Sequence, residues 1–84
     1  MATIERINGF SLRIYTNDHE PPHVHVIKVG GEAIIELGDE HNPPTIREVY
    51  RMRDRDVAIA YDLVKQFKTK LLNGWKEIHE RRSG

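Results

Sequence analysis

Residues 23–37, HVHVIKVGGEAIIEL, predict a β-hairpin. β-Branched side chains alternate with polar ones on both sides of Gly30-Gly31, and a Gly-Gly dipeptide readily supplies a two-residue turn. Closing the hairpin at this dipeptide gives it one continuous apolar face. The expected cross-strand pairs are Val29–Glu32, Val26–Ile35 and Val24–Leu37.

The two faces of this hairpin have different chemistry. Successive side chains of a strand point to opposite sides of the sheet. If Val24 and Val26 point into the core, then His23, His25 and Glu36 must share the opposite face. The sequence therefore predicts a polar, histidine-bearing face that points away from the core.

A second hairpin is predicted before this one, because Asn8-Gly9 separates two strand-like runs, residues 3–7 and 10–16. Asn-Gly favours the positive φ angles of a type I′ turn. A two-residue turn would place Ile4 opposite Arg13, which breaks the apolar pattern. We therefore expect a β-bulge or a longer connection in this hairpin.

Beyond the hairpins, residues 46–52 are expected to form a fifth strand, with the lead-in to a helix as the alternative. The apolar period becomes helical from Asp54 onward. Asn73-Gly74 interrupts this helical pattern, so we expect a weak point there or two helices in line. The chain thus predicts an α+β fold, a four- or five-stranded antiparallel meander packed on one face by a C-terminal helix. The helical stripe, expected to pack on the valine face, consists of Val57, Tyr61, Val64, Phe67 or Lys68, Leu71, Trp75 and Ile78.

Length and composition limit the classes of protein to which the chain can belong. Its 84 residues predict a single domain, 1–84, with a thin core. The formal net charge is zero, which argues against binding nucleic acid or membrane by bulk charge. The absence of cysteine excludes a disulfide scaffold and a cysteine-ligated zinc finger. Charges near the N-terminus and the lack of a long apolar run predict a cytoplasmic protein without membrane association.

Residues 17–25, NDHEPPHVH, carry three imidazoles and two carboxylates in nine positions. Two histidines at i and i+2 of a strand lie about 7 Å apart on one face, close enough for both to reach one metal ion. A divalent ion such as zinc or manganese is the cofactor that this pattern would hold. The candidate catalytic residues are His23, His25 and Asp18, and the candidate metal ligands are His19, His23, His25 and Glu36. Asp18 is a further residue that could complete the metal site.

Three uses of this cluster are compatible with the sequence. The histidines could serve a stiff loop or a partner contact, with His25 paired to Glu36 across the strands. They could bind a metal ion, with a position left for water. They could also act without metal as the base and the acid of phosphodiester cleavage.

Arginines cluster after the second hairpin. If residues 46–52 are extended, Arg47, Arg51 and Arg53 project from one face and could contact nucleic acid or an acidic partner. Nearby acidic residues would partly neutralise this row, which makes an ordinary solvated surface the alternative.

The chain resembles a family of small bacterial proteins known only as a domain of unknown function, family number 4160. The resemblance is carried by residues 3–10, 15–26 and 31–33, with Leu71-Leu72 and Trp75 near the C-terminus, and its core is Asp-His-x-Pro-Pro-His-x-His. Members are often encoded beside another small domain, in arrangements typical of toxin–antitoxin modules. The resemblance transfers no reaction, substrate or metal.

We expect an interaction module of a small bacterial two-protein system, of the toxin–antitoxin type, with the His-rich loop as its working surface. The alternative is a compact, ribonuclease-like hydrolase that uses the histidines with or without a metal ion. Residues 1–45 carry three basic and seven acidic side chains and residues 46–84 ten and six, so the halves have charges of −4 and +4. With a thin core and an open sheet edge, this asymmetry predicts a partner, either a second copy in a homodimer or the product of a neighbouring gene.

Overall fold

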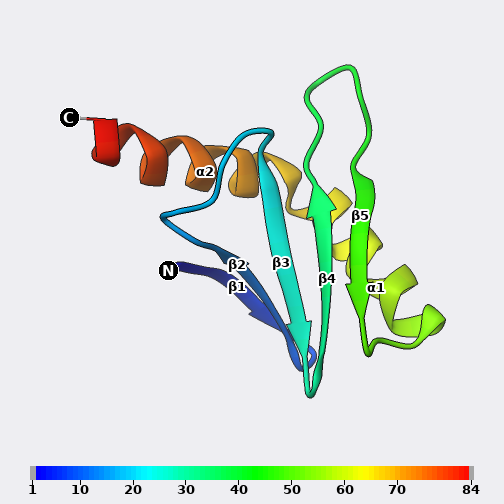
Figure 1. Ribbon diagram of the computed structural model, residues 1–84. Helices are drawn as coiled ribbons and strands as arrows, with labels where there is room; N and C mark the ends of the chain where they lie inside the picture. The colour runs from blue at the N-terminus through cyan, green and yellow to red at the C-terminus, as the bar shows by residue number, and fades with distance from the viewer. Residues whose placement is uncertain (1, 84) are drawn as a thin grey trace.

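The computed structural model describes residues 2–83, which form a five-stranded sheet followed by two helices (Figure 1). Neighbouring strands are antiparallel and follow the order β1-β2-β3-β4-β5, so the sheet is a meander and the expected α+β class is confirmed. The elements are β1 (Ala2–Ile7), β2 (Phe10–Ile14), β3 (His23–Lys28), β4 (Gly31–Glu36), β5 (Thr45–Tyr50), α1 (Asp54–Gln66) and α2 (Lys68–Ser83).

The first hairpin forms as predicted. Asn8 and Gly9 have φ angles of 50° and 84°, the positive values that a type I′ turn requires. The register of β1 against β2 shifts between Thr3 and Glu5, which confirms the expected bulge.

The second hairpin turns one residue earlier than predicted. Val29 and Gly30 form the turn, and Gly30 takes the positive φ of 76°. Gly31 already belongs to β4, where a Cβ would lie only 2.4 Å from the carbonyl oxygen of Arg51. The second glycine is thus required for close packing, and the predicted register was wrong by two residues, a shift that leaves every side chain on its expected face. The observed pairs are Lys28–Gly31, Val26–Ala33 and Val24–Ile35.

Strand β5 is the fifth strand that the sequence predicted, and all six of its residues are exposed. It ends at Tyr50, because Arg51 adopts a left-handed φ of 48°. Within the described chain β5 pairs only with β4, so its other edge carries unpaired backbone groups.

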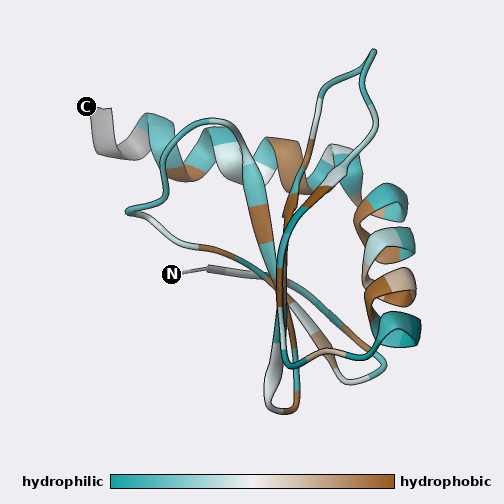
Figure 2. Cartoon of the chain, turned by 45° about the vertical axis from the view of Figure 1, so that its right-hand side comes forward, coloured by the Kyte–Doolittle hydropathy of each residue, from teal (hydrophilic) through white to brown (hydrophobic). Residues whose placement is uncertain are grey.

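The helical region breaks at Phe67 rather than at Asn73-Gly74, which corrects the sequence prediction. Gly74 lies inside α2, and a Cβ there would lie 3.0 Å from the Cδ1 atom of Ile4, so the glycine allows α2 to approach β1. The two helices run in clearly different directions rather than in line (Figure 2). Neither helix is long and apolar enough, over the part that the structure describes, to cross a membrane.

Both helices pack on one side of the sheet and enclose a single apolar core (Figures 1 and 2). The expected contact between the helical stripe and the valine face is confirmed. His23 and His25 lie on the opposite face of β3, and α2 extends past the end of the sheet at which β3 begins. Fully buried core residues include Leu12, Ile14, Val24, Val26, Ile35, Leu37, Val64 and Leu71.

Candidate functional site

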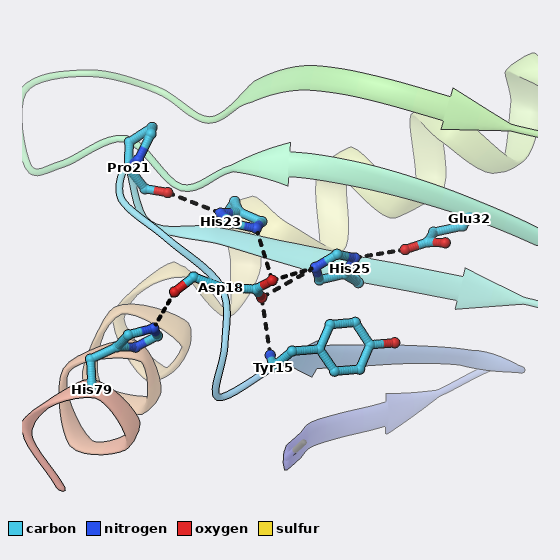
Figure 3. Close-up of polar contacts among 7 residues, drawn as sticks. All are labelled: Tyr15, Asp18, Pro21, His23, His25, Glu32 and His79. Atoms are coloured by element: carbon cyan, nitrogen blue, oxygen red, sulfur yellow. Dashed lines mark hydrogen bonds and ion pairs between the residues drawn. The ribbon is translucent and has the colours of Figure 1, made fainter. Parts of the chain in front are cut away.

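Asp18, His23 and His25 come together at the start of β3 (Figure 3). The alternation of the strand places both imidazoles on one face, with ring centroids 5.3 Å apart. Asp18 comes from the loop that connects β2 to β3, and its carboxylate faces both rings.

The loop is fixed in place by its own backbone and by α2. The N–H of Tyr15 donates to Asp18 Oδ2 at 3.0 Å, and the N–H of Asp18 donates to the carbonyl of Tyr15 at 3.1 Å. From α2, His79 Nε2 lies 2.9 Å from the carbonyl oxygen of Asp18. These contacts on both sides hold the Asp18 carboxylate over β3.

Each histidine of β3 is oriented through its Nδ1 atom. His23 Nδ1 lies 2.9 Å from the carbonyl oxygen of Pro21, and His25 Nδ1 lies 2.6 Å from Oε2 of Glu32. Both Nε2 atoms face the carboxylate of Asp18. Asp18 Oδ1 is 3.5 Å from His23 Nε2 and 3.4 Å from His25 Nε2.

Both histidines are buried, although the sequence predicted an accessible pair. His23 is 5% exposed and His25 is 9% exposed. The ring of Trp75 packs on His23 with centroids 5.2 Å apart, and Tyr15 covers His25 at 4.4 Å. Pointing away from the core therefore does not expose these side chains, because the β2–β3 connection and α2 cover them.

A family model matches residues 9–80, which is most of the chain. The description of that family is a domain of unknown function, DUF4160. The chain belongs to the DUF4160 family. Comparisons with curated proteins and with solved structures gave no match. The DUF4160 match spans Asp18, both histidines of β3 and His79, so the whole cluster lies within the family domain.

The composition of the cluster in this DUF4160 chain differs from the predicted ligand set. The three groups with converging ligand atoms are Asp18, His23 and His25, whereas the prediction named His19 and Glu36 alongside the two histidines. His19 is exposed in the loop.

The carboxylate that contacts His25 belongs to Glu32, and not to Glu36, which one interpretation of the sequence paired with His25. Glu36 lies opposite His23, and Ile34 lies opposite His25, because the register differs by two residues. Glu32 then reaches His25 diagonally on the same face. The alternation of residues 32, 34 and 36 placed Glu32 on this face, but only the correct turn could identify it as the partner.

The predicted row of arginines does not form, because β5 ends before Arg51 and Arg53. Arg47 lies elsewhere: it lines a cavity of about 200 Å³. The other residues that line this cavity are Asn17, Asp18, His19, Glu20 and His23. Among the described side chains, Arg47 is thus a cation that lines the cavity beside the cluster of the DUF4160 domain.

Further along β5, the hydroxyl of Tyr50 donates a hydrogen bond to the carboxylate of Glu48. This hydrogen bond, together with burial and the negative charges of Glu48 and Glu32, raises the pKa of Tyr50 above its ordinary value of 10.0. The tyrosine is therefore a neutral, exposed aromatic group on the outer strand.

Proposed function

We propose that this chain is an interaction module of a small bacterial two-protein system of the toxin–antitoxin type, acting in the cytoplasm. Its partner is the small protein encoded by a neighbouring gene, and strand β5 is the binding element. The observation that carries the proposal is that β5 is an outer strand with an unpaired edge and six exposed residues.

The side chains of β5 support a protein contact rather than a purely solvated edge. Ile46, Val49 and Tyr50 are 42%, 41% and 52% exposed. Val49 lies opposite Ala33, on the helix side of the sheet, and Tyr50 lies opposite Glu32, on the histidine side. A partner strand added to this edge would cover apolar side chains on both faces and pair the free backbone groups.

The other outer strand, β1, is a poorer candidate. Its side chains Ile4 and Ile7 already pack against the core, and α2 lies against this strand. β5 also borders the exposed part of the His-rich loop, since Arg47 shares a cavity with Asn17 and His19. Loop and strand can therefore contribute to one binding surface.

The test is co-expression with the neighbouring gene product, followed by affinity purification and light scattering over a concentration series. We expect a stable complex that Val49→Lys weakens by at least about 10-fold, because a charge would enter the apolar contact. Val29→Lys is the matched control, since Val29 is 97% exposed but lies in the β3–β4 turn. Monomeric mass throughout without a co-purifying protein, or equal effects of the two substitutions, would contradict the proposal.

A second candidate function, phosphodiester hydrolysis, is favoured by the position of Arg47. A cation beside an imidazole and a carboxylate is an arrangement that can bind a phosphate and move a proton. RNA would be incubated with the protein between pH 5 and 8, with and without zinc or manganese. His23→Ala and His25→Ala should each abolish cleavage, and cleavage that survives both substitutions would exclude this candidate.

A further inference from the structure

The protonation pattern of His23 follows from its partner. The Nδ1 atom of His23 lies 2.9 Å from the carbonyl oxygen of Pro21, and a carbonyl oxygen can only accept a hydrogen bond. Nδ1 therefore carries the hydrogen. In a neutral ring, Nε2 is then left with a lone pair, and this lone pair faces Asp18.

His25 follows the same pattern with a different partner. Its Nδ1 lies 2.6 Å from Glu32, and an ionised carboxylate also only accepts. The hydrogen of the neutral ring is again on Nδ1, and Nε2 carries the lone pair. Two lone pairs and the Asp18 carboxylate thus point toward one another, an arrangement that is repulsive unless a positive charge lies among them.

We propose that Asp18, His23 and His25 form a zinc site, with Asp18 Oδ1 and the two Nε2 atoms as ligands. This inference is independent of the partner proposed for β5. Tetrahedral zinc with bonds of about 2.0–2.1 Å has ligand atoms about 3.4 Å apart. Asp18 Oδ1 lies 3.5 Å and 3.4 Å from the two Nε2 atoms, close to that spacing, and Asp18 Oδ2 lies 3.2 Å from His25 Nε2. Two imidazole nitrogens with one carboxylate oxygen are a donor set that suits zinc better than magnesium or calcium.

Every ligand of this site is held by a second hydrogen bond. Pro21 and Glu32 fix the two imidazoles, and the N–H of Tyr15 holds Asp18 through its Oδ2 atom at 3.0 Å. Carbonyl and carboxylate groups behind histidine ligands are the usual outer partners of protein-bound zinc, because they fix the tautomer and the ring orientation. Three protein ligands leave a fourth position, and the cavity that Arg47 lines adjoins Asp18 and His23.

A proton is the competing source of positive charge. A proton on His25 Nε2 would produce an imidazolium between Asp18 and Glu32 and would satisfy both carboxylates. His23 Nε2, at 3.5 Å from Asp18, gains little from this arrangement.

The experiment is calorimetric titration of the full chain with zinc chloride, after dialysis against EDTA and then metal-free buffer. We expect one ion per chain with a dissociation constant of about 1 μM or tighter. Asp18→Asn and His23→Gln should weaken binding by more than about 100-fold, and Glu32→Gln by about 10- to 100-fold. The matched controls are Glu36→Gln, from the same face of β4, and His41→Gln, from another loop; both should bind zinc as the wild type does.

If a variant of a proposed ligand fails to fold, a second measurement on the wild-type protein tests the zinc site. Cobalt(II) would replace zinc, and the strong visible absorption of four-coordinate cobalt should appear at one equivalent. Absence of zinc binding by the wild type, weak six-coordinate cobalt absorption, or equal affinity in folded ligand variants and controls would each overturn the proposal.

Discussion

Residues 15–22 and residues 38–44 are loops that each contain two consecutive prolines and an aspartate that accepts backbone N–H groups of its own loop. In the first, Asp18 Oδ2 accepts the N–H of Tyr15. In the second, Asp39 Oδ1 accepts the N–H groups of His41 and Asn42, both at 2.8 Å. Helix α2 holds both loops through backbone carbonyls, with His79 at Asp18 and with Lys68 at Asp39 and Asn42.

The two aspartates differ in the exposure of their carboxylates and in the groups that their second contacts reach. Asp39 is exposed, and the same Oδ1 atom also accepts the side-chain amide of Asn42 at 2.9 Å. Asp18 is largely covered and directs Oδ1 at two imidazoles, because the strand after its loop begins with His23 and His25. An aspartate that accepts hydrogen bonds from its own loop therefore does not form a cluster by itself. The strand that follows the loop must also carry histidines at alternate positions.

The largest expected effect is a difference in stability between variants that remove the residue supporting each loop. Trp75 is buried, stacks on His79 at 3.9 Å and donates from Nε1 to Glu20 at 3.3 Å. Trp75→Ala should lower the free energy of unfolding by about 3–5 kcal/mol and release the first loop. The second loop has a smaller support, the hydroxyl of Tyr61 on the carbonyl of Pro44. Tyr61→Phe should cost about 0.5–1.5 kcal/mol.

Urea denaturation of both variants measures this difference. Near-equal losses would mean that the first loop does not depend on Trp75 more than the second depends on Tyr61. Hydrogen exchange of the loop amides would show which loop each substitution releases.

A second, smaller effect should have opposite signs in the two loops. In Asp18→Asn, the amide oxygen can accept from Tyr15 while the NH₂ group donates to the Nε2 lone pairs of His23 and His25. At pH 8 and with EDTA present, this variant should be more stable than wild type by about 0.5–1.5 kcal/mol. Asp39→Asn should be slightly destabilising, since a neutral amide accepts hydrogen bonds less strongly than a carboxylate.

Chemical denaturation of both variants, with EDTA and then with zinc, is the measurement. Zinc should stabilise the wild type and leave Asp18→Asn unchanged. A clear loss of stability for Asp18→Asn in EDTA at pH 8 would contradict the assignment of lone pairs to the two Nε2 atoms.

The smallest expected effect is a pH dependence of the second loop. The N–H of His41 and the side chain of Asn42 hold the pKa of Asp39 below its ordinary value of 3.8. A lowered pKa in the folded state means that the contribution to stability is complete above 3.8 and disappears as the pH falls through the folded value. An NMR titration from pH 6 to 2 should show the amide signals of His41 and Asn42 moving with a midpoint below 3.8. A midpoint at or above 3.8, or the same titration in Asp39→Asn, would refute this origin.

The sequence predicted the strands, the valine face and the members of the cluster, because these depend on local alternation. Asp18, His23 and His25 were all named, since His-x-His on a strand and an acid in the preceding loop are visible in the chain. Glu32 was missed because a hairpin with two adjacent glycines leaves its register open. The observed register places Gly31 against the backbone of Arg51, and this tertiary contact leaves no local signal in the sequence.

The predictions for the end of α1 and for the arginine row were wrong for similar reasons. Nothing in Gln66-Phe67-Lys68 marks a helix end, and the break allows α1 to contact β4 while α2 contacts β1. Arg51 leaves the extended conformation without a glycine or proline to announce it. In both cases distant packing overrides local preference.

The contact between His79 and Asp18 joins residues 61 positions apart in the chain. During synthesis the ribosome adds about 5–20 residues per second, so roughly 3–12 s separate the translation of Asp18 from that of His79. The nascent chain therefore contains Asp18, His23 and His25 well before the helix that fixes their loop exists.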